Sequence, residues 1–178
     1  VVDIDGNFIR PENPFKIGWA SSYSYCPSNE TLRERYSALF QEMTRNYDID
    51  GFFIGHNRFA PLGHEFNDIF SCGCPHCVRS ASEFGYDFEE MKKALSKLRE
   101  NLKNINQQKV NELQELNLGF LDFLYLLGSE SAIVDWINFR CDIIARTVSE
   151  FRAAVKEVRE GIIYGGDCIP PSFSLLSG

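Results

Sequence analysis

Three cysteines stand within six residues, at Cys72, Cys74 and Cys77, and this spacing lets them share one metal ion. Structural zinc takes four soft ligands, usually thiolates with or without histidine, at the corners of a tetrahedron. The fourth ligand must come from elsewhere, and Cys26 is the first candidate because it follows an expected strand. Competing candidates are His64, His76 and Cys168. The sequence therefore predicts a structural zinc site; the alternative is free thiols on a tight turn, or one disulfide.

Polar side chains also follow the short apolar run 52–54, which is typical of a strand covered on both faces. His56, Asn57 and Arg58 come where a parallel sheet would place a binding site. They are assigned to substrate binding, together with Trp19 in an earlier apolar run. Simpler interpretations stay open: His56 as a hydrogen-bonded structural histidine, and Arg58 as an ion-pair partner that braces the loop.

Three carboxylates are candidates for acid–base chemistry. Asp167 comes directly after the run 161–166, and Glu65 and Asp68 lie in the loop behind the first apolar run. Hydrolysis of a glycosidic bond needs one carboxylic acid to protonate the leaving oxygen and a second carboxylate as nucleophile or base. These three residues are therefore predicted to be catalytic, although Asp167 could instead be a turn residue before two prolines.

Composition limits the function classes. The 178 residues are 44% hydrophobic and 24% charged, as in an ordinary globular domain. A net charge of -7 disfavours a nucleic-acid partner, and the lack of a long apolar stretch disfavours a membrane span. Six clustered cysteines are too few for a disulfide scaffold, and no signal peptide is visible, so a cytoplasmic location is favoured.

The elements that must position these side chains follow from periodicity and turn signals. Helices are expected over 31–46, from 87 to about 104, over about 107–127 and over 132–160, with 56–86 as an irregular loop. Ser28 or Asn29 is expected to cap the first helix. Short strands are expected at 15–20, 51–55 and 161–166. Trp136 and Cys141 are interpreted as residues buried along the last helix.

The order strand, helix, strand predicts a parallel α/β sheet. Three strands cannot bury both edges of such a sheet, and a complete (β/α)8 barrel needs about 250 residues. Residues 1–178 are therefore interpreted as a single α/β domain, a partial TIM barrel covering roughly strands three to five. Residues 56–130 would be a loop and helical insertion within it. A complete open α/β sandwich is the alternative.

Five segments resemble a family of uncharacterised bacterial TIM-barrel proteins related to glycoside hydrolases. The family's CPNNP turn, DGIFLDYIRF strand and CFCxxC loop correspond to Cys26–Asn29, Asp48–Phe59 and Cys72–Cys77. Its WxxFR helix and LDCFSPSLA strand end correspond to Trp136–Arg140 and a segment from residue 165 to 174. The resemblance extends over about residues 3–178 and implies a barrel acting on carbohydrate. The family strand usually carries an acid where this sequence has Gly55, so one candidate carboxylate is missing.

These observations predict a glycoside hydrolase-like barrel that acts on a carbohydrate through carboxylate acid–base chemistry. The alternative is a non-catalytic carbohydrate-binding or scaffolding barrel with a zinc-stabilised loop, and a third interpretation is a zinc-stabilised interaction module. A carbohydrate is the expected ligand. The edges of a partial barrel also predict self-association or association with the rest of the barrel.

Overall fold

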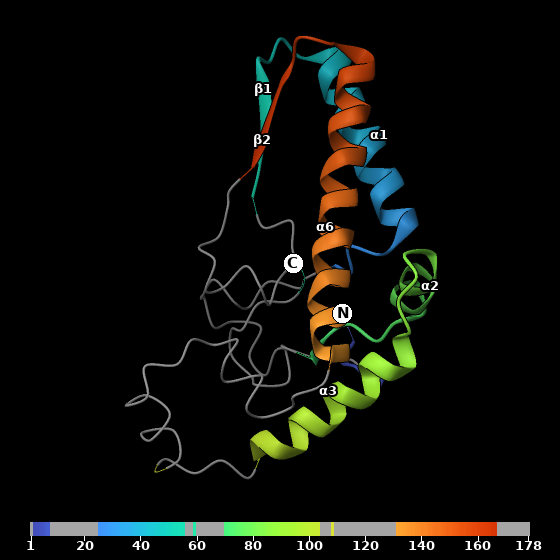
Figure 1. Cartoon of the computed structure of the whole chain (residues 1–178). Coiled ribbons are helices and arrows are strands. Elements are labelled where there is room, and N and C mark those ends of the chain that lie inside the picture. The colour runs from blue at the N-terminus through green and yellow to red at the C-terminus, as the bar shows by residue number, and fades with distance from the viewer. Residues whose placement is uncertain are drawn as a thin grey trace.

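A computed structural model describes residues 2–7, 25–55, 59, 70–103, 108 and 131–166 of the chain. These residues form α1 (Glu30–Asn46), β1 (Gly51–Ile54), α2 (Pro75–Glu83), α3 (Phe88–Lys103), α6 (Ser131–Val158) and β2 (Ile163–Gly166) (Figure 1). The expected helices 31–46, 87–104 and 132–160 agree closely with α1, α3 and α6. The expected strand 15–20 and the expected helix 107–127 lie outside the described residues, apart from residue 108.

The prediction of a partial TIM barrel is wrong. The described residues are mostly helical, and their sheet has two parallel strands and does not close. β1 pairs directly with β2, in the register Gly51 with Ile163 and Ile54 with Gly166. Two short apolar runs separated by long helices look alike in sequence whether they belong to an eight-stranded barrel or to an isolated parallel pair. The apolar runs were therefore assigned correctly as strands, and the sheet around them was not.

α6 is the longest of the described elements and runs beside most of them (Figure 1). Its 28 residues extend over about 42 Å at 1.5 Å per residue. Its buried side chains recur at helical spacing along its whole length; they are Ala132, Ile133, Trp136, Ile137, Phe139, Arg140, Ile143, Thr147, Phe151, Ala154 and Val155. Figure 1 shows α1 and the two strands along one half of this helix, and α2 and α3 at the other half.

The part of the molecule around the C-terminal half of α6 is called the strand end: α1, β1, β2 and residues 147–158 of α6. Its interior is aromatic, because the Phe40 ring centroid lies 5.2 Å from that of Phe52 on β1 and 5.2 Å from that of Phe151 on α6. α1 begins at a true N-cap, where Asn29 Oδ1 accepts a hydrogen bond from the Leu32 amide at 3.2 Å. Aromatic packing therefore joins β1 to α1 and α1 to α6.

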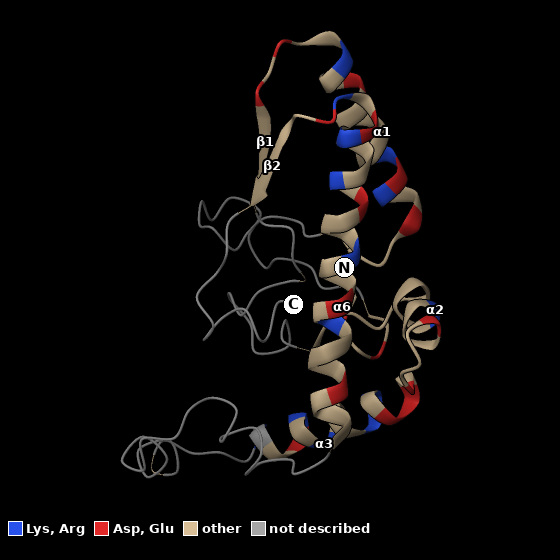
Figure 2. Cartoon of the chain, turned by 45° about the horizontal axis from the view of Figure 1, so that its top comes forward, with Lys and Arg blue, Asp and Glu red and all other residues tan. Residues whose placement is uncertain are grey.

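The two strands present one face to this interior and one face to solvent. Phe52 and Tyr164 are paired and half-buried, whereas Phe53 is 75% exposed and Ile163 is 68% exposed. Figure 2 shows that neither strand carries a charged residue, while α1 has acidic and basic side chains along it. Gly51 is required at its position because a Cβ there would lie 2.6 Å from the Ile163 carbonyl oxygen.

The part around the N-terminal half of α6 is called the cysteine end. It consists of α2, α3, residues 2–7, Cys26, Phe59, residues 70–74 and residues 131–143 of α6. Its core is a separate cluster that includes Ile4, Met91 and Leu95, and neither Phe151 nor Val155 belongs to it. α3 starts where Asp87 Oδ1 accepts a hydrogen bond from the Glu90 amide at 3.0 Å. The two ends of α6 therefore have cores of their own.

α2 is a correction to the expected irregular loop 56–86. Its start follows helix chemistry, with Pro75 at the first helical position, where the missing amide hydrogen costs nothing. Gly, Pro and Cys in the surrounding sequence are typical of a loop, and they concealed the short helix. Within the part of the chain that is described, none of the helices combines the length and the apolar character needed to cross a membrane.

Candidate metal centre

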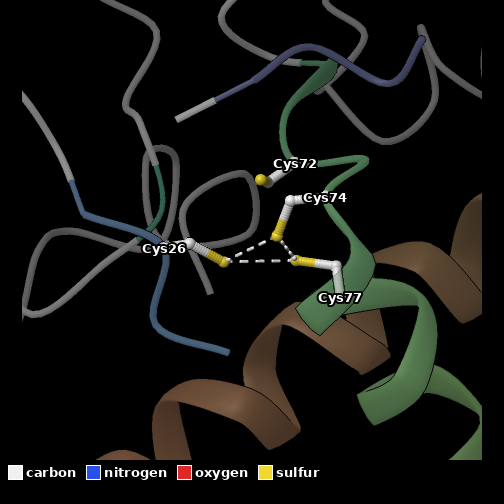
Figure 3. A group of neighbouring side chains, drawn as sticks. All are labelled: Cys26, Cys72, Cys74 and Cys77. Carbon is white, nitrogen blue, oxygen red and sulfur yellow. Dashed lines mark hydrogen bonds between the residues drawn. The ribbon is translucent and has the colours of Figure 1, made fainter. Parts of the chain in front are cut away.

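Four cysteine side chains converge at the cysteine end. The Sγ atoms of Cys26, Cys72, Cys74 and Cys77 all lie within 4.8 Å of one another (Figure 3). Cys26 Sγ is 3.4 Å from Cys77 Sγ and 3.5 Å from Cys74 Sγ, and Cys74 Sγ is 3.8 Å from Cys77 Sγ. The arrangement is compatible with a structural metal ion. These are the four cysteines that the sequence predicts as ligands.

Two separate turns deliver the sulfurs. Cys26 opens the turn before α1, in which the Asn29 amide donates to the Cys26 carbonyl oxygen at 2.9 Å. Cys74 is the N-cap residue of α2, and Cys77 is in the first turn of that helix. A helix start places residues i and i+3 on the same side, so the spacing C-x-x-C brings both thiols to one point. Cys26 is therefore brought close to Cys74 and Cys77, which are far from it in sequence.

The loop that carries Cys72 and Cys74 is fastened to the N-terminal segment. Asp3 and Ser71 form an antiparallel bridge, and the Gly73 amide donates to the Asp3 carbonyl oxygen at 3.0 Å. A Cβ on Gly73 would lie 2.8 Å from that same oxygen and would overlap the Ile4 backbone. Glycine is therefore needed between the two cysteines, since only it allows this close approach.

The sulfurs differ in exposure. Cys77 is 0% exposed and Cys72 is 3% exposed, whereas Cys26 and Cys74 are half-buried. Cys77 Sγ also lies 3.3 Å from Ser28 Oγ, in the turn that holds Cys26. The separations between sulfurs are well beyond the ~2.05 Å of a disulfide bond, and all four thiols are free. The disulfide alternative therefore does not describe this cluster.

Mutual hydrogen bonding shifts the thiol pKa values in opposite directions. The hydrogen bond with Cys26 lowers the pKa of Cys72 to about 7 and is the main reason that the pKa of Cys74 is also lowered. The hydrogen bond with Cys72 raises the pKa of Cys26, and the one with Cys26 raises that of Cys77. The pKa values of Cys72 and Cys74 are thus shifted towards the thiolate form. Thiolates are the form that binds metal.

A buried arginine lies beside this cluster. Arg140 on α6 is 1% exposed, and its guanidinium carbon is 4.5 Å from the ring centroids of both Phe59 and Trp136. Its Nη1 donates a hydrogen bond of 2.7 Å to the carbonyl oxygen of Ser71, the residue before Cys72. Trp136 is 2% exposed, in agreement with its interpretation as a core residue.

No functional role is predicted for Arg140 from the sequence, although it lies in the segment Trp136–Arg140 that carries part of the family resemblance. One signal was available, because residues 136 and 140 share a helix face with the apolar stripe, and an arginine on such a stripe must be buried. Cys141, for which the sequence predicts burial, is half-buried and packs against the core. Its thiol is not part of the cluster.

The other predicted site residues are distributed differently. The predicted catalytic and substrate-binding residues all lie outside the described residues; they are Asp167, Glu65, Asp68, His56, Asn57, Arg58 and Trp19. The competing ligands His64 and Cys168 lie outside them as well. His76 is described, and its Nδ1 lies 3.1 Å from Arg79 Nη2, apart from the four-cysteine group. Among the sites predicted from the sequence, the metal centre is therefore the one whose residues the structure describes.

No protein family, curated protein or solved structure matches this chain.

Proposed function

We propose that this chain is a structural zinc-binding protein, in which Cys26, Cys72, Cys74 and Cys77 hold one Zn²⁺ as thiolates. The observation that carries the proposal is the convergence of the four Sγ atoms within 4.8 Å of one another. Four thiolates on two separate turns are the usual ligand set of structural zinc sites. The bound ion would fasten the turn before α1 to the start of α2.

The size of the cluster supports a single ion. A tetrahedral zinc site with Zn–S bonds of about 2.3 Å has sulfurs about 3.8 Å apart. The separations among Cys26, Cys74 and Cys77 are 3.4, 3.5 and 3.8 Å, close to this value. Cys72 Sγ lies within 4.8 Å of the other three sulfurs, so an ion can enter with a shift of at most about 1 Å in any sulfur–sulfur separation. An iron–sulfur cluster would spread its cysteines further, because sulfide-bridged irons must fit between them.

A structural role is favoured over a catalytic one. Catalytic zinc keeps one coordination position for water or substrate, whereas four thiolates leave none. Two of the sulfurs are also closed off from solvent, with Cys77 at 0% and Cys72 at 3% exposure. The ion would therefore contribute folding free energy to the cysteine end. Carbohydrate hydrolysis stays a prediction, since its acids Asp167, Glu65 and Asp68 lie outside the described residues.

The test is metal content with matched cysteine variants. The chain purified without chelator is expected to contain about one zinc per molecule by elemental analysis. Replacing that zinc with Co²⁺ is expected to give the intense sulfur-to-cobalt charge-transfer bands and visible d–d bands of tetrahedral thiolate coordination. Cys74→Ser and Cys77→Ser are expected to lose the tight site and to shift or abolish these bands.

Cys141→Ser is the matched control. This cysteine lies on α6, is half-buried and stands outside the cluster, so its loss should leave metal content and cobalt spectrum unchanged. A wild-type chain that takes up neither Zn²⁺ nor Co²⁺ would overturn the proposal. So would cobalt bands that survive in both Cys74→Ser and Cys77→Ser.

A further inference from the structure

Arg140 is a fully buried cation, and such a group needs a compensating environment. Transferring an isolated charge from water to a protein interior costs several kcal/mol even after relaxation, on the order of the whole stability of a domain. Part of the compensation is visible in the rings of Phe59 and Trp136, whose faces attract the guanidinium. Another part is the hydrogen bond of 2.7 Å to the Ser71 carbonyl oxygen.

The sulfurs supply negative charge to the same place. Cys72 and Cys77 belong to the same buried core as Phe59 and Trp136, the two rings on the guanidinium, and Cys26 and Cys74 pack against that core. Four thiolates around one divalent ion carry a formal charge of about −2. A buried centre with that charge is itself costly unless a cation or hydrogen-bond donors face it.

We propose that Arg140 is the counter-charge of the metal centre and positions its ligand loop, an inference that rests on the proposed zinc site. The guanidinium offsets part of the negative charge of the zinc–thiolate group. Its hydrogen bond to Ser71 holds the backbone from which Cys72 projects. Charge and position thus act together on the same loop.

This role accounts for the residues around Arg140. The cation must be held away from water to act strongly on the centre, and the faces of Phe59 and Trp136 do so. Trp136 lies one turn before Arg140 on α6, so helix geometry alone brings the ring to the guanidinium. Outer residues of this kind typically change metal affinity 10- to 100-fold when they are replaced.

The test compares the zinc affinities of Arg140→Gln and Arg140→Lys, measured at one pH by competition with a chromophoric chelator. Arg140→Gln keeps a hydrogen-bond donor but removes the charge, and its affinity is expected to fall by about 10- to 100-fold. Arg140→Lys keeps the charge and loses the planar fork, and it is expected to recover most of the affinity. Equal losses in both variants, or no loss in either, would overturn the proposal.

A second measurement separates charge from packing. Cys26→His reduces the formal charge of the centre from about −2 to about −1 and keeps four ligands. If Arg140 is the counter-charge, the fold-loss caused by Arg140→Gln must be smaller in the Cys26→His background than in the wild type. An identical fold-loss in both backgrounds means that Arg140 acts through packing alone, and the counter-charge role is then wrong.

Arg159→Gln is the control for general destabilisation. Arg159 also donates to backbone carbonyl oxygens, those of Ile49 at 2.7 Å and Thr44 at 2.9 Å, but at the strand end. Its replacement should leave zinc affinity unchanged, and helical circular dichroism should show that every variant compared is folded. Failure of the zinc proposal has a different signature, because the wild-type chain would then bind no zinc for Arg140 to influence.

Discussion

The two ends of α6 are stabilised by different chemistry. At the strand end, the ring of Phe40 packs on those of Phe52 and Phe151, with ring centroids 5.2 Å apart in both contacts. At the cysteine end, four thiols and the buried Arg140 occupy the centre of the packing. Aromatic packing is therefore the main feature of the strand end, beside polar contacts such as the ion pair between Arg33 and Glu150, whereas the cysteine end gathers charge that an ion must balance. One helix thus serves two cores with different requirements.

Removal of the ion is expected to have the largest effect and to be confined to one end. A strong chelator should release the zinc and expose the amides of α2, because thiolates without a metal ion repel one another. Hydrogen exchange should then be fast in α2 and still slow in α1 and in residues 147–158 of α6. Equal loss of protection at both ends would mean that they form one cooperative unit, and would end the distinction.

Phe151→Ala is the corresponding change at the strand end. The side chain is 1% exposed and contacts two other rings, so its truncation should lower the free energy of unfolding by about 3–5 kcal/mol. Zinc affinity should stay within twofold of wild type, since Phe151 is outside the core that contains the cysteines. Denaturant unfolding and chelator competition measure the two quantities; a large loss of zinc affinity would show that the ends are coupled.

Two glycines allow a matched pair of smaller changes. Gly73→Ala would push the ligand loop off the Ile4 backbone, and Gly51→Ala would press β1 against the Ile163 carbonyl. Each should destabilise by about 1–3 kcal/mol, the usual cost of overpacking. Gly73→Ala alone should also weaken zinc binding, as measured by chelator competition. If Gly51→Ala weakened it equally, the sheet would have to be counted as part of the metal site.

The smallest expected effect is the pH dependence of the strand end. Burial raises the pKa of Tyr164 to about 12, so the folded chain keeps the phenolic proton where the unfolded chain, near 10, loses it. The stability that comes from the buried, protonated Tyr164 side chain is fully present below pH 10 and is lost as the pH rises towards 12. The Tyr164 hydroxyl has no hydrogen-bond partner among the described residues.

Tyr164→Phe should therefore be neutral or slightly stabilising at pH 8, and should flatten the loss of stability between pH 10 and pH 11. Denaturant midpoints at these pH values give the comparison. The effect is small because the ring is only half-buried and solvent screens it. A steeper loss in the variant would contradict the assignment of this dependence to Tyr164.

Local signals in the sequence predict α1, α3 and α6 and the clustering of Cys72, Cys74 and Cys77, but they do not reveal α2. Asn29 and Asp87 mark the starts of α1 and α3 because capping depends on neighbours in sequence. The spacing of Cys72, Cys74 and Cys77 likewise reflects one turn and one helix start. Cys26 was chosen because strand ends share a face in a barrel, yet its place is set by the turn before α1.

Long-range pairing could not be obtained in the same way. Whether the run 51–54 joins a barrel or a two-stranded sheet depends on which strands pair with it, and that information is spread over the whole chain. The burial of Arg140 depends on Phe59 and Ser71, which are remote from it in sequence. Patterns in the sequence therefore predict the ligands of the proposed metal ion but not the buried Arg140 beside them.

The position of Cys26 in the chain has a kinetic consequence. Both α1 and β1 lie between Cys26 and Cys72, so an ion bound to these two sulfurs closes the chain into a ring that contains them. Ring closure restricts how far the ends of this segment can separate, and less entropy is then lost when α1 and β1 find α6. Refolding of the strand end should therefore be faster when zinc is added before the denaturant is diluted than when it is added afterwards.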